Sequence, residues 1–226
     1  MDLSKRLSAI AAFVTNGNRL ADVGCDHGYI PITLIEEGRI PSAIAMDVRR
    51  GPLDRAKEHI LSHDLQNYIE VRLSDGVQKL NCNEADTVLI AGMGGQLIRK
   101  ILSEGKEVLS SVSELVLQPQ SDLFLVRQYL CENHYCILDE QAVLEDGKYY
   151  FIFKVTHGEE MHVSESDLYY GYFLRKRKDP LLRSFLEKEM KQQKTIMKRT
   201  KGIDEKRFLE VEAELIRIQN NLEMMI

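Results

Sequence analysis

Five short apolar runs alternate with helix-length segments over the first 135 residues, and this alternation is the strongest constraint on the fold. The apolar runs cover residues 19–24, 42–48, 69–75, 86–92 and 114–119. The segments between them with helical patterns cover residues 30–38, 53–63, 96–108 and 122–133. Strand–helix alternation of this kind predicts βαβ units and a parallel sheet that is buried on both faces.

The pattern changes after residue 135. Residues 136–145 and 148–155 are both strand-like, and Asp146-Gly147 lies between them. An Asp-Gly pair between two strand patterns is typical of a tight β-hairpin turn. We therefore predict an α/β fold in which five parallel strands are followed by a terminal antiparallel hairpin.

Two long helical patterns follow a polar linker at residues 156–167. Asp179-Pro180 has the pattern of a helix start, and that helix is predicted to end near Lys201, before Gly202. Asp204 can cap a second helix, whose apolar residues are spaced as in a coiled coil: Phe208, Val211, Leu215, Ile218, Leu222 and Met225. We expect an antiparallel helical hairpin, and we divide the chain into domains at residues 1–160 and 161–226.

The charge of the chain is unevenly distributed. The formal net charge is −5, yet residues 175–207 contain 13 Lys or Arg and only five Asp or Glu. A basic segment on an acidic body favours a polyanionic partner such as RNA, although a solvated helical face gives the same pattern. The candidate RNA-binding residues are Arg175, Lys176, Arg177, Lys178, Lys191, Lys194, Lys198, Arg199 and Lys201.

The sequence favours a cytoplasmic protein. No apolar run approaches the 18 residues of a membrane span, and the first 14 residues have the pattern of an amphipathic helix rather than of a signal peptide. The four cysteines form no CxxC pair, so neither a disulfide framework nor a metal site is expected. The apolar seam of the last helix favours pairing within one chain, and it leaves dimerisation open.

The loop after the first apolar run carries the first candidate site. Gly24 and Gly28 allow the backbone to approach a ligand closely, and Asp26 lies between them. A dinucleotide-binding loop cradles phosphate and has no carboxylate in this place. Asp26 is better suited to a ligand with a cationic ammonium or sulfonium group, although a purely structural turn has a similar pattern.

Further polar and glycine-rich positions follow the next three runs. Asp47 ends the second run and can bind both hydroxyls of a ribose, or else cap the next helix. Asp75-Gly76 ends the third run, where the acid can accept an adenine amine, or simply form a turn. Residues 91–95 contain three glycines around Met93. A ribose, an adenine and a charged tail without phosphate together describe S-adenosylmethionine.

The sequence stretches DVGCDHGYIP, MDVRRGPL, LSDG, AGMGG and LQPQ carry a family resemblance. With them the chain resembles class I methyltransferases, and more closely the bacterial tRNA adenine-N1 methyltransferases of the TrmK type, which modify adenine 22 in the D-arm. The resemblance implies a Rossmann-like fold and S-adenosylmethionine as cofactor. The residues it implies around the cofactor are Asp22, Gly24, Asp26, His27, Gly28, Asp47, Val48, Asp75, Gly76, Ala91, Gly92, Met93 and Gly94.

The resemblance also implies direct methyl transfer to an unpaired or flipped adenine of tRNA. The product is a cation, and Asp26 and Tyr29 are the candidates for stabilising its charge. His27 and Gln118 are the candidate positioning groups. Enzymes that methylate exocyclic amines often carry (D/N)PP(Y/F) after the fourth strand, and this chain has AGMGG there instead.

Three alternatives remain open at this stage. The first is a methyltransferase for another RNA, for DNA or for a small molecule. The second is an NAD-dependent oxidoreductase, which the carboxylate of Asp26 disfavours. The third is a non-catalytic RNA-binding adaptor that retains the pocket.

Overall fold

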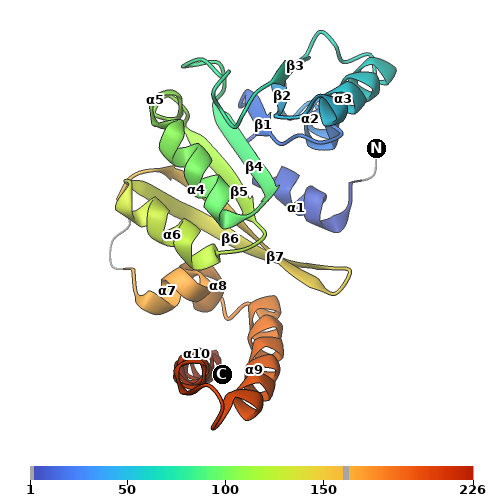
Figure 1. Cartoon of the computed structure of the whole chain (residues 1–226). Helices are drawn as coiled ribbons and strands as arrows, with labels where there is room; N and C mark the ends of the chain where they lie inside the picture. The colour runs from blue at the N-terminus through green and yellow to red at the C-terminus, as the bar shows by residue number, and fades with distance from the viewer. Residues whose placement is uncertain (1–2, 160–162, 226) are drawn as a thin grey trace. The chain divides into compact units, whose positions relative to one another are not determined.

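The protein divides into two compact units, Met1–Met161 and His162–Ile226, in the computed structural model (Figure 1). The structure describes residues 3–159 and 163–225. The domain boundary expected between residues 160 and 161 lies outside the described residues. Each unit is therefore described by itself.

The first unit is built on a seven-stranded sheet with the order β3-β2-β1-β4-β5-β7-β6. The parallel strands are β1 (Leu20–Val23), β2 (Ala43–Asp47), β3 (Ile69–Leu73), β4 (Thr87–Met93) and β5 (Glu114–Pro119). The strands β6 (Tyr135–Glu145) and β7 (Lys148–His157) form the predicted antiparallel hairpin, and β7 pairs with β5. Asp146 and Gly147 both have positive φ, as a tight hairpin turn requires. The mixed sheet predicted from the sequence is confirmed.

Helices cover both faces of this sheet. Residues of α1 (Lys5–Phe13), α2 (Tyr29–Glu36) and α3 (Arg50–Ser62) share one hydrophobic core cluster with β1 and β2. The opposite face is covered by α4 (Gly95–Glu104), α5 (Lys106–Leu109) and α6 (Leu123–Glu132) (Figure 1). The helix predicted over residues 96–108 is interrupted at Gly105, where Val77 approaches too closely for a side chain.

The strand order places a switch point between β1 and β4. From β1 the chain proceeds to β2 and β3 on one side, and from β4 it proceeds to β5 on the other. The connecting loops at the carboxyl ends of β1 and β4 therefore diverge and leave a crevice between them. Ligands in open parallel sheets bind in such a crevice.

Over residues 163–225, the second unit contains four helices: α7 (Glu165–Tyr170), α8 (Tyr172–Lys176), α9 (Pro180–Thr200) and α10 (Glu205–Met224). The two long helices were predicted, and so were their caps. The side chain of Asp179 accepts from the backbone N–H groups of Leu181 and Leu182, and that of Asp204 accepts from Arg207. The short helices α7 and α8 were not predicted, because five or six residues are too few to show a repeating helical pattern.

Arg175 is a structural residue of this second unit. Its guanidinium pairs with the Asp167 carboxylate, and its Nε donates to Asn221 Oδ1 over 2.7 Å. The side chain is only 15% exposed, because α7 and α10 enclose it. The guanidinium is therefore occupied inside the fold, which disfavours Arg175 as an RNA-binding residue. The other eight candidate cations have exposed side chains.

We predict opposite effects on stability for two glycine-to-alanine substitutions. A Cβ on Gly95 would lie 2.5 Å from the Ser121 carbonyl oxygen and 2.9 Å from Val126 Cγ2, so Gly95→Ala should reduce the free energy of unfolding by about 1–3 kcal/mol. Gly51 lies in α3, where a Cβ would meet only Arg55 Nη1, at 3.9 Å. Gly51→Ala should raise the free energy by about 0.4–1 kcal/mol. Urea denaturation measures both; equal effects would contradict the packing described for Gly95.

Candidate active site

A cavity of about 440 Å³ opens at the carboxyl ends of β1, β2 and β4. Nine of the residues predicted from the sequence line it: Asp22, Gly24, Asp26, His27, Tyr29, Asp47, Ala91, Gly92 and Met93. Six further residues of its wall were not predicted: Arg6, Leu7, Cys25, Ile30, Arg49 and Gln120. The cavity coincides with the switch point of the sheet, where a ligand is expected.

Two carboxylates lie together in the wall of this cavity. Asp22 is buried near the end of β1, and Asp47 is buried at the end of the neighbouring strand β2. Burial, together with the charge of Asp47, raises the pKa of Asp22 to about 7. Asp47 Oδ1 accepts the backbone N–H of Arg49 over 2.8 Å, which fixes the turn into α3. Asp47 does not cap α3, whose N-cap residue is Arg49, and its carboxylate lies in the cavity wall.

Cys25 is a neutral thiol in this setting. Burial raises the pKa of the Cys25 thiol, and the nearby carboxylates of Asp22, Asp47 and Asp26 raise it further. A thiolate is the nucleophilic form of cysteine, so Cys25 is not suited to covalent catalysis. Its side chain fills the core beside the cavity.

The loops after β1 and β4 touch each other across the site. Gly24 has a φ of +78°, and any side chain there would collide with the Met93 side chain. Gly92 also has a positive φ, +75°. Both positions favour glycine because of their backbone conformation, and a side chain on Gly24 would in addition displace the end of the Met93 side chain.

Aromatic rings form one side of the cavity. The rings of His27 and Tyr29 have centroids 5.1 Å apart, and both stack with the ring of His59 from α3, at 5.5 and 5.3 Å. His59 Nδ1 lies 3.0 Å from the carbonyl oxygen of His27, which holds the cluster in place. These rings give a flat apolar surface on which a base can stack.

Asp26 lies at the exposed edge of the same loop. Its carboxylate is 3.5 Å from Arg55 Nη2 and 3.6 Å from His27 Nε2. The side chain is 66% exposed, so these contacts are weak and a ligand can replace them. Asp26 can therefore offer negative charge at the mouth of the cavity.

Gln118 does not line the cavity, contrary to its predicted role beside the substrate. Its side chain is fully buried beneath the site. Gln118 Oε1 accepts from Arg6 Nη1 over 3.0 Å and from the Gly92 N–H over 3.2 Å, while Nε2 donates to the Pro119 carbonyl over 3.0 Å. Gln118 thus orients Arg6 and the β4 loop. No local motif marks Arg6, because it reaches the site from the N-terminal helix.

Three other predicted cofactor residues lie outside this cavity. A Cβ on Gly28 would lie 3.4 Å from Ala56 Cβ, because Gly28 packs against α3. Gly94 precedes α4, and a Cβ there would lie 3.3 Å from Ser121 Oγ. Val48 is 59% exposed beside Asp47. These three positions lie near the site in sequence, but Gly28 and Gly94 face other residues of the protein and Val48 faces solvent.

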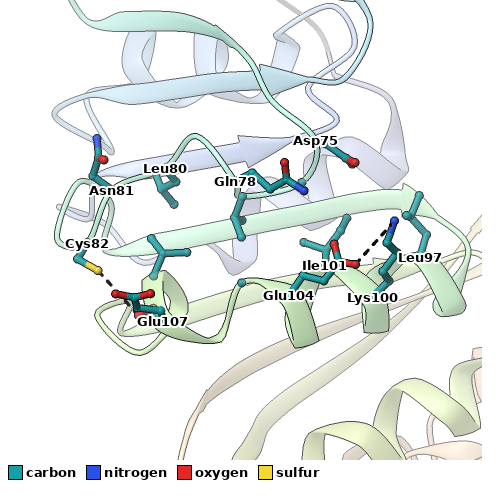
Figure 2. A pocket seen from close by; sticks show the side chains of 14 residues that line it. Asp75, Gln78, Leu80, Asn81, Cys82, Leu97, Lys100, Ile101, Glu104 and Glu107 are labelled. Carbon is teal, nitrogen blue, oxygen red and sulfur yellow. Dashed lines mark hydrogen bonds and ion pairs between the residues drawn. The ribbon is translucent and has the colours of Figure 1, made fainter.

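Asp75 and Gly76 line a second cavity, of about 300 Å³, instead of the first (Figure 2). Leu97 and Ile101 of α4 form part of its wall, and Asp75 lies at one end of the view. The loop is tied to the first site, because the Ser74 N–H donates to the Asp47 carbonyl over 2.9 Å. Asp75 is the next residue after Ser74, so its backbone lies close to the end of β2 that carries Asp47.

The donor set of the first cavity fits an adenosyl amino acid better than a dinucleotide. Three carboxylates, Asp22, Asp26 and Asp47, are combined with the guanidiniums of Arg6 and Arg49. Carboxylates suit ribose hydroxyls and positive charge, whereas they repel phosphate. Within the described residues, no group of three or more His, Cys, Asp or Glu side chains is arranged to hold a metal ion. In the same part of the chain, no helix is both long and apolar enough to cross a membrane.

Sequence comparison with known proteins also identifies a methyltransferase. Residues 3–153 match a methyltransferase domain family. The tRNA (adenine(22)-N(1))-methyltransferase of Bacillus subtilis is 37% identical over 159 residues, which are 70% of this chain and 67% of that protein.

Solved structures extend the similarity to nearly the whole chain. The B. subtilis m1A22 tRNA methyltransferase TrmK superposes with a TM-score of 0.90 at 28% identity, covering 98% of this chain and 99% of that one. A Streptococcus pneumoniae protein in complex with S-adenosyl-L-methionine superposes with a TM-score of 0.91 at 35% identity, covering 98% of this chain and all of the other. The chain therefore belongs to the methyltransferase domain family, and within it to the tRNA (adenine(22)-N1)-methyltransferases of the TrmK type.

Proposed function

We propose that the protein transfers a methyl group from S-adenosylmethionine to N1 of adenine 22 in tRNA. The observation that carries this proposal is the cavity at the switch point, where carboxylates lie at the carboxyl ends of two adjacent strands, at or next to the last residue, and no phosphate cradle is formed. Membership in the tRNA (adenine(22)-N1)-methyltransferase family supplies the substrate. The same carboxylates disfavour the alternative of an NAD-dependent oxidoreductase.

The acidic residues can hold the cofactor in a defined orientation. Asp47 is suited to the ribose hydroxyls, and Asp22 with Asp26 to the cationic part of the amino-acid tail. Asp75, on the loop tied to the Asp47 carbonyl, is suited to the adenine amine. When bound, S-adenosylmethionine supplies an electrophilic methyl group on a positively charged sulfur.

The reaction needs no proton transfer. The lone pair of adenine N1 forms the new N–C bond, the C–S bond breaks, and its electron pair goes to sulfur. Because N1 of neutral adenine carries no hydrogen, no general base is required, and positioning supplies most of the rate. The positive charge moves onto the adenine, where the Asp26 carboxylate and the faces of Tyr29 and His27 can stabilise it.

The second unit is the proposed tRNA-binding part. Lys191, Lys194 and Lys198 are exposed on α9, and Arg199 and Lys201 follow at its end. Exposed lysines and arginines contact phosphates without reading sequence, so they fix the position of the RNA. We further propose that the protein acts as a monomer and in the cytoplasm, where tRNA is its substrate.

The function is tested with an unmodified tRNA transcript that carries adenine at position 22. After incubation with the protein and S-adenosylmethionine, the expected product is 1-methyladenosine at position 22, mapped by mass spectrometry of RNA fragments. A transcript with guanine at position 22 should remain unmethylated. Methylation at another position, or at N6, would contradict the proposal.

We predict that Asp22 makes the stability of the free protein depend on pH. The pKa of Asp22 rises from 3.8 to about 7 on folding. Its stabilising contribution to the free energy of unfolding is therefore fully present below pH 4 and is lost as the pH rises to about 7. Asp22→Asn removes this titration. The stability of Asp22→Asn relative to wild type should therefore increase between pH 4 and pH 7, by roughly 1–4 kcal/mol. Urea denaturation at several pH values measures it, and a difference that does not change with pH would contradict the assignment.

Asp47→Ala should weaken cofactor binding at least 10-fold, because a bidentate contact to the ribose hydroxyls is lost. Calorimetric titration with S-adenosylmethionine measures the loss. Asp54→Ala, which removes an exposed carboxylate from α3, is the matched control and should bind normally. Unchanged affinity in a folded Asp47→Ala protein would remove Asp47 from the proposed site.

Reversing the charges of Lys191, Lys194 and Lys198 to glutamate should weaken tRNA binding at least 10-fold and reduce its salt dependence. The affinity for S-adenosylmethionine should remain unchanged, because the substituted residues lie in the other unit. Filter binding at several salt concentrations measures the effect. Reversal of the exposed Lys57, Lys79 and Lys148 in the first unit serves as control, and equal losses in both triple variants would argue against a specific role for α9.

A further inference from the structure

Gln120 presents an unengaged amide to the cavity. It follows the last residue of β5, and its backbone N–H donates to the Met93 carbonyl over 2.9 Å. A Cβ built on Gly92 would lie 3.8 Å from Gln120 Nε2, so the amide lies over the β4 loop. Across residues 3–159 and 163–225, the side-chain amide of Gln120 makes no hydrogen bond. Its donor and its acceptor are thus available to a ligand.

The side-chain amide of Gln118, two residues earlier, is hydrogen-bonded within the fold. Its oxygen and nitrogen are both engaged within the fold, by Arg6, Gly92 and Pro119. Gln118 is fully buried, while Gln120 is exposed in the cavity wall. The two glutamines of the LQPQ stretch therefore have different tasks: the first supports the loop, and the second faces the ligand.

The proposed reaction limits how the target adenine can be recognised. N1 has to face the methyl group, so it cannot take part in recognition. The remaining hydrogen-bonding edge carries the N6 amine, which donates, and N7, which accepts. A planar carboxamide matches this pair, because it presents an acceptor and a donor side by side.

The charged side chains of the cavity do not match that pattern. Carboxylates such as Asp26 and Asp47 only accept, and the guanidiniums of Arg6 and Arg49 only donate. Among the described residues that line the cavity, Gln120 is the single carboxamide. We propose that Gln120 reads the target base, with Oε1 accepting from the N6 amine and Nε2 donating to N7; this assignment rests on the proposed N1 methylation.

The contact to the N6 amine is expected to strengthen during the reaction. Methylation places positive charge on the ring, shared between N1 and N6, so the N6–H group becomes a stronger donor. A hydrogen bond that is stronger in the transition state than in the ground state raises kcat. Gln120 is therefore a specificity-determining residue whose loss should affect turnover as well as substrate binding.

The test combines a protein variant with a base analogue. Wild type, Gln120→Ala and the control Gln66→Ala, an exposed glutamine outside the cavity, are assayed on transcripts with adenosine or 7-deazaadenosine at position 22. The analogue keeps N1 and the N6 amine and has a C–H group in place of the N7 acceptor. For wild type and control, we expect kcat/KM to fall about 5- to 20-fold with the analogue. Gln120→Ala should lose about 10- to 100-fold on adenosine and lose little more with the analogue.

Calorimetric titration with S-adenosylmethionine separates this role from cofactor binding or misfolding, because Gln120→Ala should bind the cofactor as wild type does. Equal wild-type rates on both transcripts would overturn the assignment without any variant. A full 7-deaza penalty retained in Gln120→Ala, or a loss of cofactor affinity, would overturn it as well. If wild type fails to methylate the adenosine transcript, the proposed function itself is wrong, and this outcome is distinct from the others.

Discussion

The burial of two carboxylates beside each other is the constraint on which the site depends. Asp22 lies next to the last residue of β1 and pairs with Ala45 of β2, two residues before Asp47, so both carboxylates lie on the same face and line one cavity. Burial and mutual repulsion raise the pKa of Asp22 to about 7, which makes the free site electrostatically unfavourable in its ionised form. A cationic ligand relieves that repulsion, and an anionic one increases it. The sheet topology thereby selects the charge class of the cofactor.

The remaining parts of the site are held by contacts that converge on the same crevice. Gln118 connects the N-terminal helix to the β4 loop through Arg6 and Gly92. The absent side chain of Gly24 lets Met93 approach the β1 loop. His59 fixes the loop of His27 from α3. Segments distant in sequence therefore shape one cavity, while the basic residues of α9 lie in the other unit.

The sheet, its terminal hairpin and the two long helices could be predicted, because buried strands, an Asp-Gly turn and helix caps leave local patterns in the sequence. The acids at the strand ends were predictable for the same reason. Arg6 and Gln120 were not recognised, since only the tertiary fold brings α1 and the end of β5 to the cavity. The structural role of Arg175 was not predicted, because the sequence shows its charge but not its buried partner, Asp167. Asp75 follows the expected strand, yet its side chain lies in a neighbouring cavity.

We propose that Asp22 provides the counter-charge for a cationic cofactor. The most direct measurement is the number of protons released when S-adenosylmethionine binds, obtained by calorimetry at pH 7 in buffers of different ionisation enthalpy. Because the pKa of Asp22 is about 7 in the free protein, binding of the cation should release about half a proton. Asp22→Asn should release almost none. Proton uptake on binding, or equal release by wild type and Asp22→Asn, would contradict the claim.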